Sequence, residues 1–204
     1  MTFIPNGTKL MSRGRPRQFD SEKALHDAML VFWRNGYRGT SVDDLTSALG
    51  INKPSLYAAF GDKEALFLQV VDHYRDKMMA PALKRLAECE NLRSGLSEFF
   101  GAIGDVVVEN ETPPGCLIAC LLSEECCESA TIKAKLAGLI EGADKFFQRK
   151  FDNHRNELNP VLSPESAALL MVSTLHGLSI RARAGGTKEV LHAAAKAFID
   201  VVLV

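Results

Sequence analysis

The stretch GINKPSLYAAF, residues 50 to 60, brings together side chains that can bind a polyanion. Lys53, Ser55 and Tyr57 lie close together in it. An ammonium group can pair with a guanine edge or a phosphate, and hydroxyl groups can bind either. Lys63 follows at the predicted start of another helix, where free amides also attract an anion. Taken singly, Tyr57 could be a half-buried packing residue and Lys63 a solvated charge; together they favour a nucleic-acid contact.

A second group of cations lies near the N-terminus, in RGRPR. Arg13, Arg15 and Arg17 occur in a stretch without apolar periodicity, which predicts a flexible basic arm over residues 1 to 18. Arginines on such an arm can enter a minor groove, where groove width and A·T content are read. The alternative is a plain disordered tail.

Thiols are the third group of reactive side chains. Cys116 and Cys120 are one helical turn apart, Cys126 and Cys127 are adjacent, and Cys89 lies apart from them. Capture of a soft metal or oxidation by an electrophile is one reading of these spacings. The other is packing or pocket lining, because no C-x-x-C pair occurs and cysteine on a helix often acts as a small buried hydrophobe.

Caps and apolar spacing predict that short helices position the first group. A helix over about 21 to 34 is stopped by NGY. Ser41 and Asp44 resemble a capping box that starts a second helix, and Gly50 ends it. Asp62 is expected to cap a longer fourth helix.

The third helix is expected to begin at the cap Asn52, with Pro54 in its first turn. Helices this short need tertiary packing, and the Gly-containing link before Asn52 is typical of a helix-turn-helix. We expect Leu56, Ala59 and Phe60 to face inward. Lys53, Ser55, Tyr57 and Ala58 then face outward, where a recognition helix enters the major groove.

The rest of the chain keeps a helical pattern, with turn signals such as TPPG and AGGT between segments. No convincing strand pattern occurs, although VVV at 106 to 108 is ambiguous. We therefore expect an all-α fold, a small N-terminal bundle joined through the fourth helix to a larger bundle. The helices predicted in the larger bundle span about 82–90, 92–109, 116–126, 130–152, 164–184 and 188–203.

RGRPRQFD and ALHDAMLVFWRNGYRGTSVDDLTSALGINKPSLYAAFGDKEALF closely resemble the DNA-binding domain of TetR-type transcriptional repressors, with the G-T-S-V, L-Y-x-x-F and K-E-x-L elements in register. The resemblance implies a homodimer that binds a palindromic operator and is released when an unknown small effector enters the C-terminal domain. It assigns phosphate contacts to Thr40 or Ser41, Tyr57 and Lys63, and the major-groove surface to Lys53, Pro54 and Ser55.

The expected division of the chain follows from the same stretches. Residues 19 to 66 should form the helix-turn-helix domain, and residues 67 to 204 the effector-binding and dimerisation domain. PPGCLIACLL and HGLSIRARAG bear only a faint likeness to one branch of the family and do not identify the effector.

The two C-terminal helices are apolar over much of their circumference, which suits a four-helix dimer interface; the alternative is that both are simply core. An apolar effector pocket is expected in the same half of the chain. His176 could equally be a satisfied core histidine. The residues proposed to line the pocket are Phe99, Phe100, Cys116, Leu117, Cys120 and His176.

Composition and charge limit the function classes. Residues 1 to 60 carry a net charge of +3 and residues 61 to 204 a net charge of −4, which suits a polyanion at one end, although such an excess is often only solubilising. No membrane span or secretory signal is predicted, so we expect a cytoplasmic protein. No nucleophile–base set, phosphate loop or metal signature occurs, so we expect neither an enzyme nor a bound cofactor.

Two rival readings remain. One is a thiol-based redox or electrophile-handling helical protein, which would need a low-pKa cysteine and a turnover cycle. The other is an architectural protein that uses RGRP as a minor-groove hook.

Overall fold

The computed structural model describes residues 20–108, 112–125 and 127–204, so Arg13, Arg15, Arg17, the predicted arm and Cys126 lie outside the described residues. Within these ranges the secondary structure is helical, apart from one isolated antiparallel bridge between Leu158 and Leu203. This confirms the all-α prediction.

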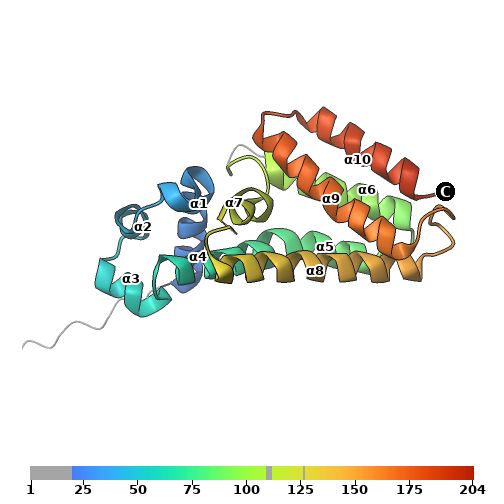
Figure 1. Cartoon of the computed structure of the whole chain (residues 1–204). Helices are drawn as coiled ribbons and strands as arrows, with labels where there is room; N and C mark the ends of the chain where they lie inside the picture. The colour runs from blue at the N-terminus through green and yellow to red at the C-terminus, as the bar shows by residue number, and fades with distance from the viewer. Residues whose placement is uncertain (1–19, 109–111, 126) are drawn as a thin grey trace, which may run out of the picture.

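The N-terminal part, which we call the head (residues 20–66), contains α1 (Ser21–Gly39), α2 (Val42–Leu49), α3 (Lys53–Phe60) and the start of α4 (Lys63–Tyr74). We call the remainder of the described chain the body. Two of its segments are π-helical, η1 (Arg75–Met79) and η2 (Ile118–Leu122). Its α-helices are α5 (Ala80–Glu88), α6 (Leu92–Val108), α7 (Ser123–Glu125), α8 (Ala130–Asn153), α9 (Pro164–Arg183) and α10 (Lys188–Val202). Figure 1 shows the head at one end of the molecule and the C-terminus at the other.

Local caps start and stop the head helices as predicted. Ser41 and Asp44 form a reciprocal capping box at α2, and Gly50 ends that helix with φ 64°. The Asn52 side chain accepts a hydrogen bond from the Ser55 amide at α3. Gly36, at φ 75° and ψ 166°, breaks the helical path inside α1, so NGY interrupts the helix, but a further turn follows it to Gly39.

The head core forms where α1 packs against α2 and α4. Phe32, Trp33, Leu56 and Leu66 are fully buried in it. Ala59 is exposed, so the prediction that it faces inward was wrong. Leu56 and Phe60, four residues apart, centre the buried stripe of this short helix, and Ala59 lies beyond its edge.

Pro81 does not separate the fourth helix from the helix predicted over 82 to 90. α4, η1 and α5 follow one another without a loop. The Ala80 amide donates to the Arg75 carbonyl, which is the wider spacing of a π turn. Pro81 lies in the first turn of α5. Proline has no backbone N–H to donate, and the first turn of a helix tolerates this loss.

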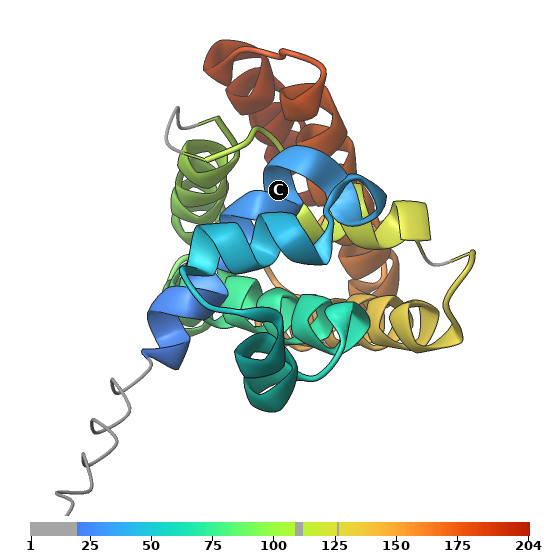
Figure 2. The same cartoon turned by 90° about the vertical axis from the view of Figure 1, so that its left-hand side faces the viewer.

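In the body, α8 packs on α9, and α10 packs on α6 and α9. The predicted helix over 116 to 126 is instead the π-helical η2 followed by the short α7. η2 contacts α1 of the head, and α7 lies between the head and α9 in Figure 1. In Figure 2, seen from the head side, the head helices lie in front of the body.

Candidate nucleic-acid interface

The first turns of α3 present the predicted side chains to solvent. Lys53, Pro54, Ser55 and Tyr57 are all exposed, and Tyr57 keeps 49% of its surface accessible. The expectation that these side chains point away from the core therefore holds.

Lys53 forms an ion pair with Asp43 of α2, at 2.8 Å between Nζ and Oδ1, and both side chains are at least half exposed. The hydrogen bond to Asp43 raises the pKa of Lys53, so the group stays cationic. A pair this exposed stabilises the head little and can exchange for a phosphate or a base edge at small cost.

Of the alternatives Thr40 and Ser41, Ser41 is exposed and Thr40 is not. The Ser41 hydroxyl donates to Asp44 Oδ2 at 2.7 Å and lies at the N-terminus of α2. Thr40 is only 1% exposed, and its hydroxyl donates to the Gly36 carbonyl at 2.7 Å. This geometry places Ser41 beside free amides that attract anions, and gives Thr40 a structural hydrogen bond.

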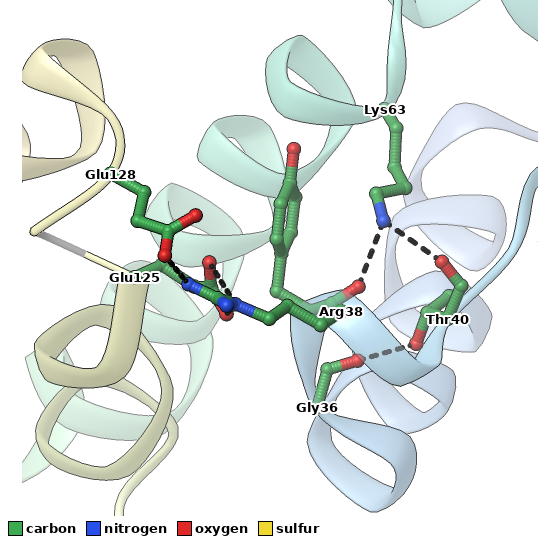
Figure 3. A network of polar contacts seen from close by, with 7 residues as sticks. Gly36, Arg38, Thr40, Lys63, Glu125 and Glu128 are labelled. Carbon is green, nitrogen blue, oxygen red and sulfur yellow. Dashed lines mark hydrogen bonds and ion pairs between the residues drawn. The ribbon is translucent and has the colours of Figure 1, made fainter.

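Lys63 points towards the end of α1. Its ammonium donates to the carbonyls of Tyr37 and Thr40 at 2.9 and 3.0 Å and lies 4.2 Å from the centre of the Tyr37 ring (Figure 3). The third ammonium hydrogen is the one that a phosphate could still use. Lys63 therefore stabilises the turn between α1 and α2 in addition to its predicted role.

The polar contacts of Arg38 were not predicted. Arg38 Nε donates to Glu125 Oε1 at 3.0 Å and Oε2 at 3.2 Å, and a terminal nitrogen lies 2.6 Å from Glu128 Oε1 (Figure 3). Trp33 Nε1 donates to the Gly115 carbonyl at 3.1 Å in a buried contact. These bonds join residues more than eighty positions apart, so no local spacing signals them.

The body contains a cavity of about 460 Å³, a size within the range of small-molecule sites. Phe99, Cys116 and His176 line it as predicted. Phe100, Leu117 and Cys120 are not among the described residues that line it. The other lining residues are Arg75, Met79, Leu83, Ile103, Val107, Ile118, Gly138, Leu139, Ile140, Gly142, Ala143, Phe146, Phe147, Arg149, Val172, Leu175 and Ser179.

The wall of the cavity is mostly apolar and carries no carboxylate among the described residues. Burial lowers the pKa of His176, with Asp144 opposing the shift, so the imidazole favours its neutral form. Arg75 is engaged by Asp72 and Asp76 at 2.9 and 2.7 Å. The cavity therefore suits a mainly apolar molecule, and the charged side chains in its described wall are Arg75 and Arg149.

Cys116 and Cys120 do not have the properties of reactive thiols. Burial raises the pKa of Cys116, which lies beside the Tyr74 hydroxyl, and burial also raises the pKa of Cys120. Thiols act as nucleophiles and metal ligands in the thiolate form, which these shifts disfavour. Within the described ranges, no group of three or more His, Cys, Asp or Glu residues is arranged to hold a metal ion.

Comparisons with known proteins agree with this geometry. The family described as "Bacterial regulatory proteins, tetR family" matches residues 24–70. The HTH-type transcriptional repressor ComR of Escherichia coli (strain K12) is 35% identical over 185 residues, which cover 88% of this chain and 87% of that protein. The chain belongs to the TetR family of transcriptional regulators.

Two further relatives are informative. The HTH-type transcriptional repressor BdcR of Escherichia coli (strain K12) is 36% identical over 113 residues, covering 54% of this chain and 57% of that protein. A cysteine variant of the TetR family regulator CifR, complexed with 26-bp double-strand operator DNA, has 30% identity and a TM-score of 0.84, covering 93% of this chain and 100% of that one.

Across the described part of this chain, no helix has the length and apolar character that a bilayer span requires.

Proposed function

We propose that this protein is a ligand-responsive transcriptional repressor. A homodimer binds a palindromic operator in the cytoplasm, and an effector in the body cavity releases it. Residues 19 to 66 are the DNA-binding domain, residues 67 to 204 the effector-binding and dimerisation domain, and residues 1 to 18, with Arg13, Arg15 and Arg17, an arm that reaches the adjacent minor groove.

The observation that carries this proposal is the exposed start of α3. Lys53, Ser55 and Tyr57 project from a capped helix whose opposite face, Leu56 and Phe60, is buried in the head. A helix held in this way can enter a major groove with its N-terminal side chains on base edges and phosphates. The names of the relatives ComR and BdcR support repression as the outcome.

The cavity in the body supports the proposal that the protein binds an effector. Phe99, Cys116 and His176 contact the effector, together with the apolar side chains around them. Because the described wall is mostly apolar and its charged residues are Arg75 and Arg149, the effector is a mainly apolar molecule without a net positive charge. It must bind the released form more tightly than the DNA-bound form for the equilibrium to shift.

The test is selection of duplexes from a random-sequence pool by the purified full-length protein. We expect enrichment of an inverted repeat, because a two-fold dimer presents two equivalent α3 helices. Affinity for the enriched duplex should fall steeply with salt, since phosphate neutralisation releases counterions. Recovery of an unenriched pool would refute the proposal.

A further inference from the structure

The segment between α6 and α8 joins the head to the body. We call its described residues, 112–125 and 127–129, the strap. The strap bonds to α1 at Gly115 and again at Glu125. Cys116 and Ile118, between these points, line the cavity, and Gly115 packs on α9. The strap therefore touches both the head and the cavity.

A charged contact fixes the strap to the head. Arg38 bonds both oxygens of Glu125, whose side chain is only 6% exposed, and also Glu128, whose side chain is 65% exposed (Figure 3). A carboxylate buried to this extent loses much of its hydration, so removing its partner is costly. The contact with Glu128 is solvated and contributes less.

A second, buried contact lies beside the first. The Trp33 indole donates to the Gly115 carbonyl, and Gly115 adopts φ 84°. A Cβ on Gly115 would lie 2.8 Å from the Ser179 carbonyl of α9 and 3.2 Å from Arg183 Cβ. At Gly115 the strap is thus wedged between α1 and α9.

The same strap forms part of the cavity wall. Cys116 and Ile118 of the strap line the cavity, and so does Ser179, against which Gly115 packs. Gly115, which bonds Trp33, directly precedes Cys116, and Glu125, which bonds Arg38, follows Ile118 in the same segment. A molecule that widens the cavity here would therefore move the segment that bonds α1. Packed interfaces of this kind shift between discrete arrangements, so a small displacement can reorient the head.

We propose that Arg38 is a positioning residue: through Glu125 and Glu128 it fixes the angle of the head on the body, and the strap carries changes in the cavity to α3. This inference rests on the proposed function, because its consequence is read as DNA affinity. Under the proposed function, the described head angle is the DNA-binding one. Losing the contact should therefore weaken DNA binding by removing preorganisation.

The experiment titrates full-length Arg38→Gln, Glu125→Gln and the double variant against the duplex enriched by the wild-type protein, over a range of salt. Each single variant should bind about threefold to tenfold more weakly, and the double variant no more weakly than the singles, because all three break one contact. The slope of the logarithm of DNA affinity against the logarithm of salt concentration, the salt slope, should stay unchanged. Loss of a phosphate contact would instead lower the size of this slope by about one.

The sign of the Glu125→Gln effect is decisive. Removing a carboxylate should tighten DNA binding if only charge matters, and should weaken it if the contact with Arg38 positions the head. Asp27→Asn is the matched control, because it removes a carboxylate paired with Lys23 on the same helix, away from the strap. Its affinity should be unchanged or slightly higher.

A second readout needs no DNA. Trp33 is the only tryptophan and is fully buried beside the strap, so its fluorescence quenching by acrylamide should rise in Arg38→Gln and Glu125→Gln. Urea unfolding checks that each variant is folded, and Glu128→Gln, at an exposed position, serves as the milder variant.

The proposal is overturned if Arg38→Gln lowers the salt slope while Glu125→Gln tightens binding, which would make Arg38 a phosphate contact. Additive losses in the double variant, or unchanged affinity in every variant, also overturn it. If the wild-type protein enriches no duplex, the proposed function fails, and quenching alone then decides this inference: unchanged quenching in all variants refutes it.

Discussion

Side chains at the proposed interface already have partners in the head. Lys63 bonds two carbonyls at the end of α1, and Lys53 is paired with Asp43. Binding a duplex must therefore exchange existing contacts for new ones, so the net gain per residue is smaller than a count of cations suggests. Residue type indicated which side chains can bind a phosphate, but their present partners come from folding.

His73 is a buried titratable side chain between α1 and α4. Burial and the nearby His26 lower its pKa, so the folded state prefers neutral His73 while the unfolded state takes up a proton as the pH falls below about 6.5. The free energy of unfolding should therefore fall between pH 7.5 and pH 5.5. Urea titrations should show a smaller fall for His73→Gln, and an equal fall would contradict this explanation.

At the scale of elements, α8 helps to form the cavity by lacking side chains. Gly138 and Gly142 are one turn apart, line the cavity, and have open space where a Cβ would be. Both are exposed, so they lie where the cavity opens. A helix interior usually avoids glycine, which makes this pair a feature of the site rather than of the helix.

Filling this opening should block the cavity without unfolding the protein. Gly142→Leu places a side chain in open space and should raise stability slightly, since leucine has the better helix propensity. Fluorescence of 8-anilinonaphthalene-1-sulfonate, a probe of apolar sites, should be reduced relative to wild type. Ala137→Leu, at an exposed position of the same helix that does not line the cavity, should leave the signal unchanged; equal signals in both variants would argue against binding in this cavity.

The strap depends on Gly115. Alanine there would adopt an unfavourable φ of 84° and approach the Ser179 carbonyl, so Gly115→Ala should cost about 1 to 3 kcal/mol or more. Gly101→Ala, inside a helix with open space around it, should be neutral or stabilise by up to about 1 kcal/mol. Urea unfolding of both variants checks the difference, and similar midpoints would show that the strap is not wedged.

Features set by residues close in sequence were predictable, and features set by packing between distant segments were not. The caps Ser41 and Asn52 were predictable because a capping bond joins residues three apart. The continuous passage through Pro81 and the contact between Arg38 and Glu125 were not, because the first depends on a widened turn and the second on packing between distant segments. Half of the proposed pocket residues miss the cavity because which face of a body helix is lined depends on its neighbours.

At the scale of the whole molecule, α9 and α10 leave apolar side chains uncovered. Leu170 and Ile180 on α9, and Val190 and Val201 on α10, are between 43% and 61% exposed. Gly177 has open space around its Cα, which allows a partner helix to approach closely. A two-fold interface between copies of these helices would cover the surface, as in the proposed dimer.

Charges on this surface should separate the proposed dimer. Ile180→Glu with Val201→Glu should give a folded monomer, because both side chains are exposed in a single chain. Sedimentation velocity should show the lower mass, and DNA affinity should fall far more than twofold, since two linked heads bind with higher effective concentration. Val161→Glu, 89% exposed in the loop before α9, is the control and should remain dimeric; a monomeric control or a dimeric double variant would contradict this interface.

The central claim is that Lys53 to Tyr57 of α3 faces a duplex. The most direct measurement repeats the selection from a random pool with Lys53→Ala and Ser55→Ala and compares the enriched duplexes with the wild-type one. The account predicts an inverted repeat with the same spacing but changed base preference within each half-site, because the dimer is intact and only base-edge contacts are lost. Enrichment of the wild-type sequence by both variants, with unchanged affinity, would contradict it.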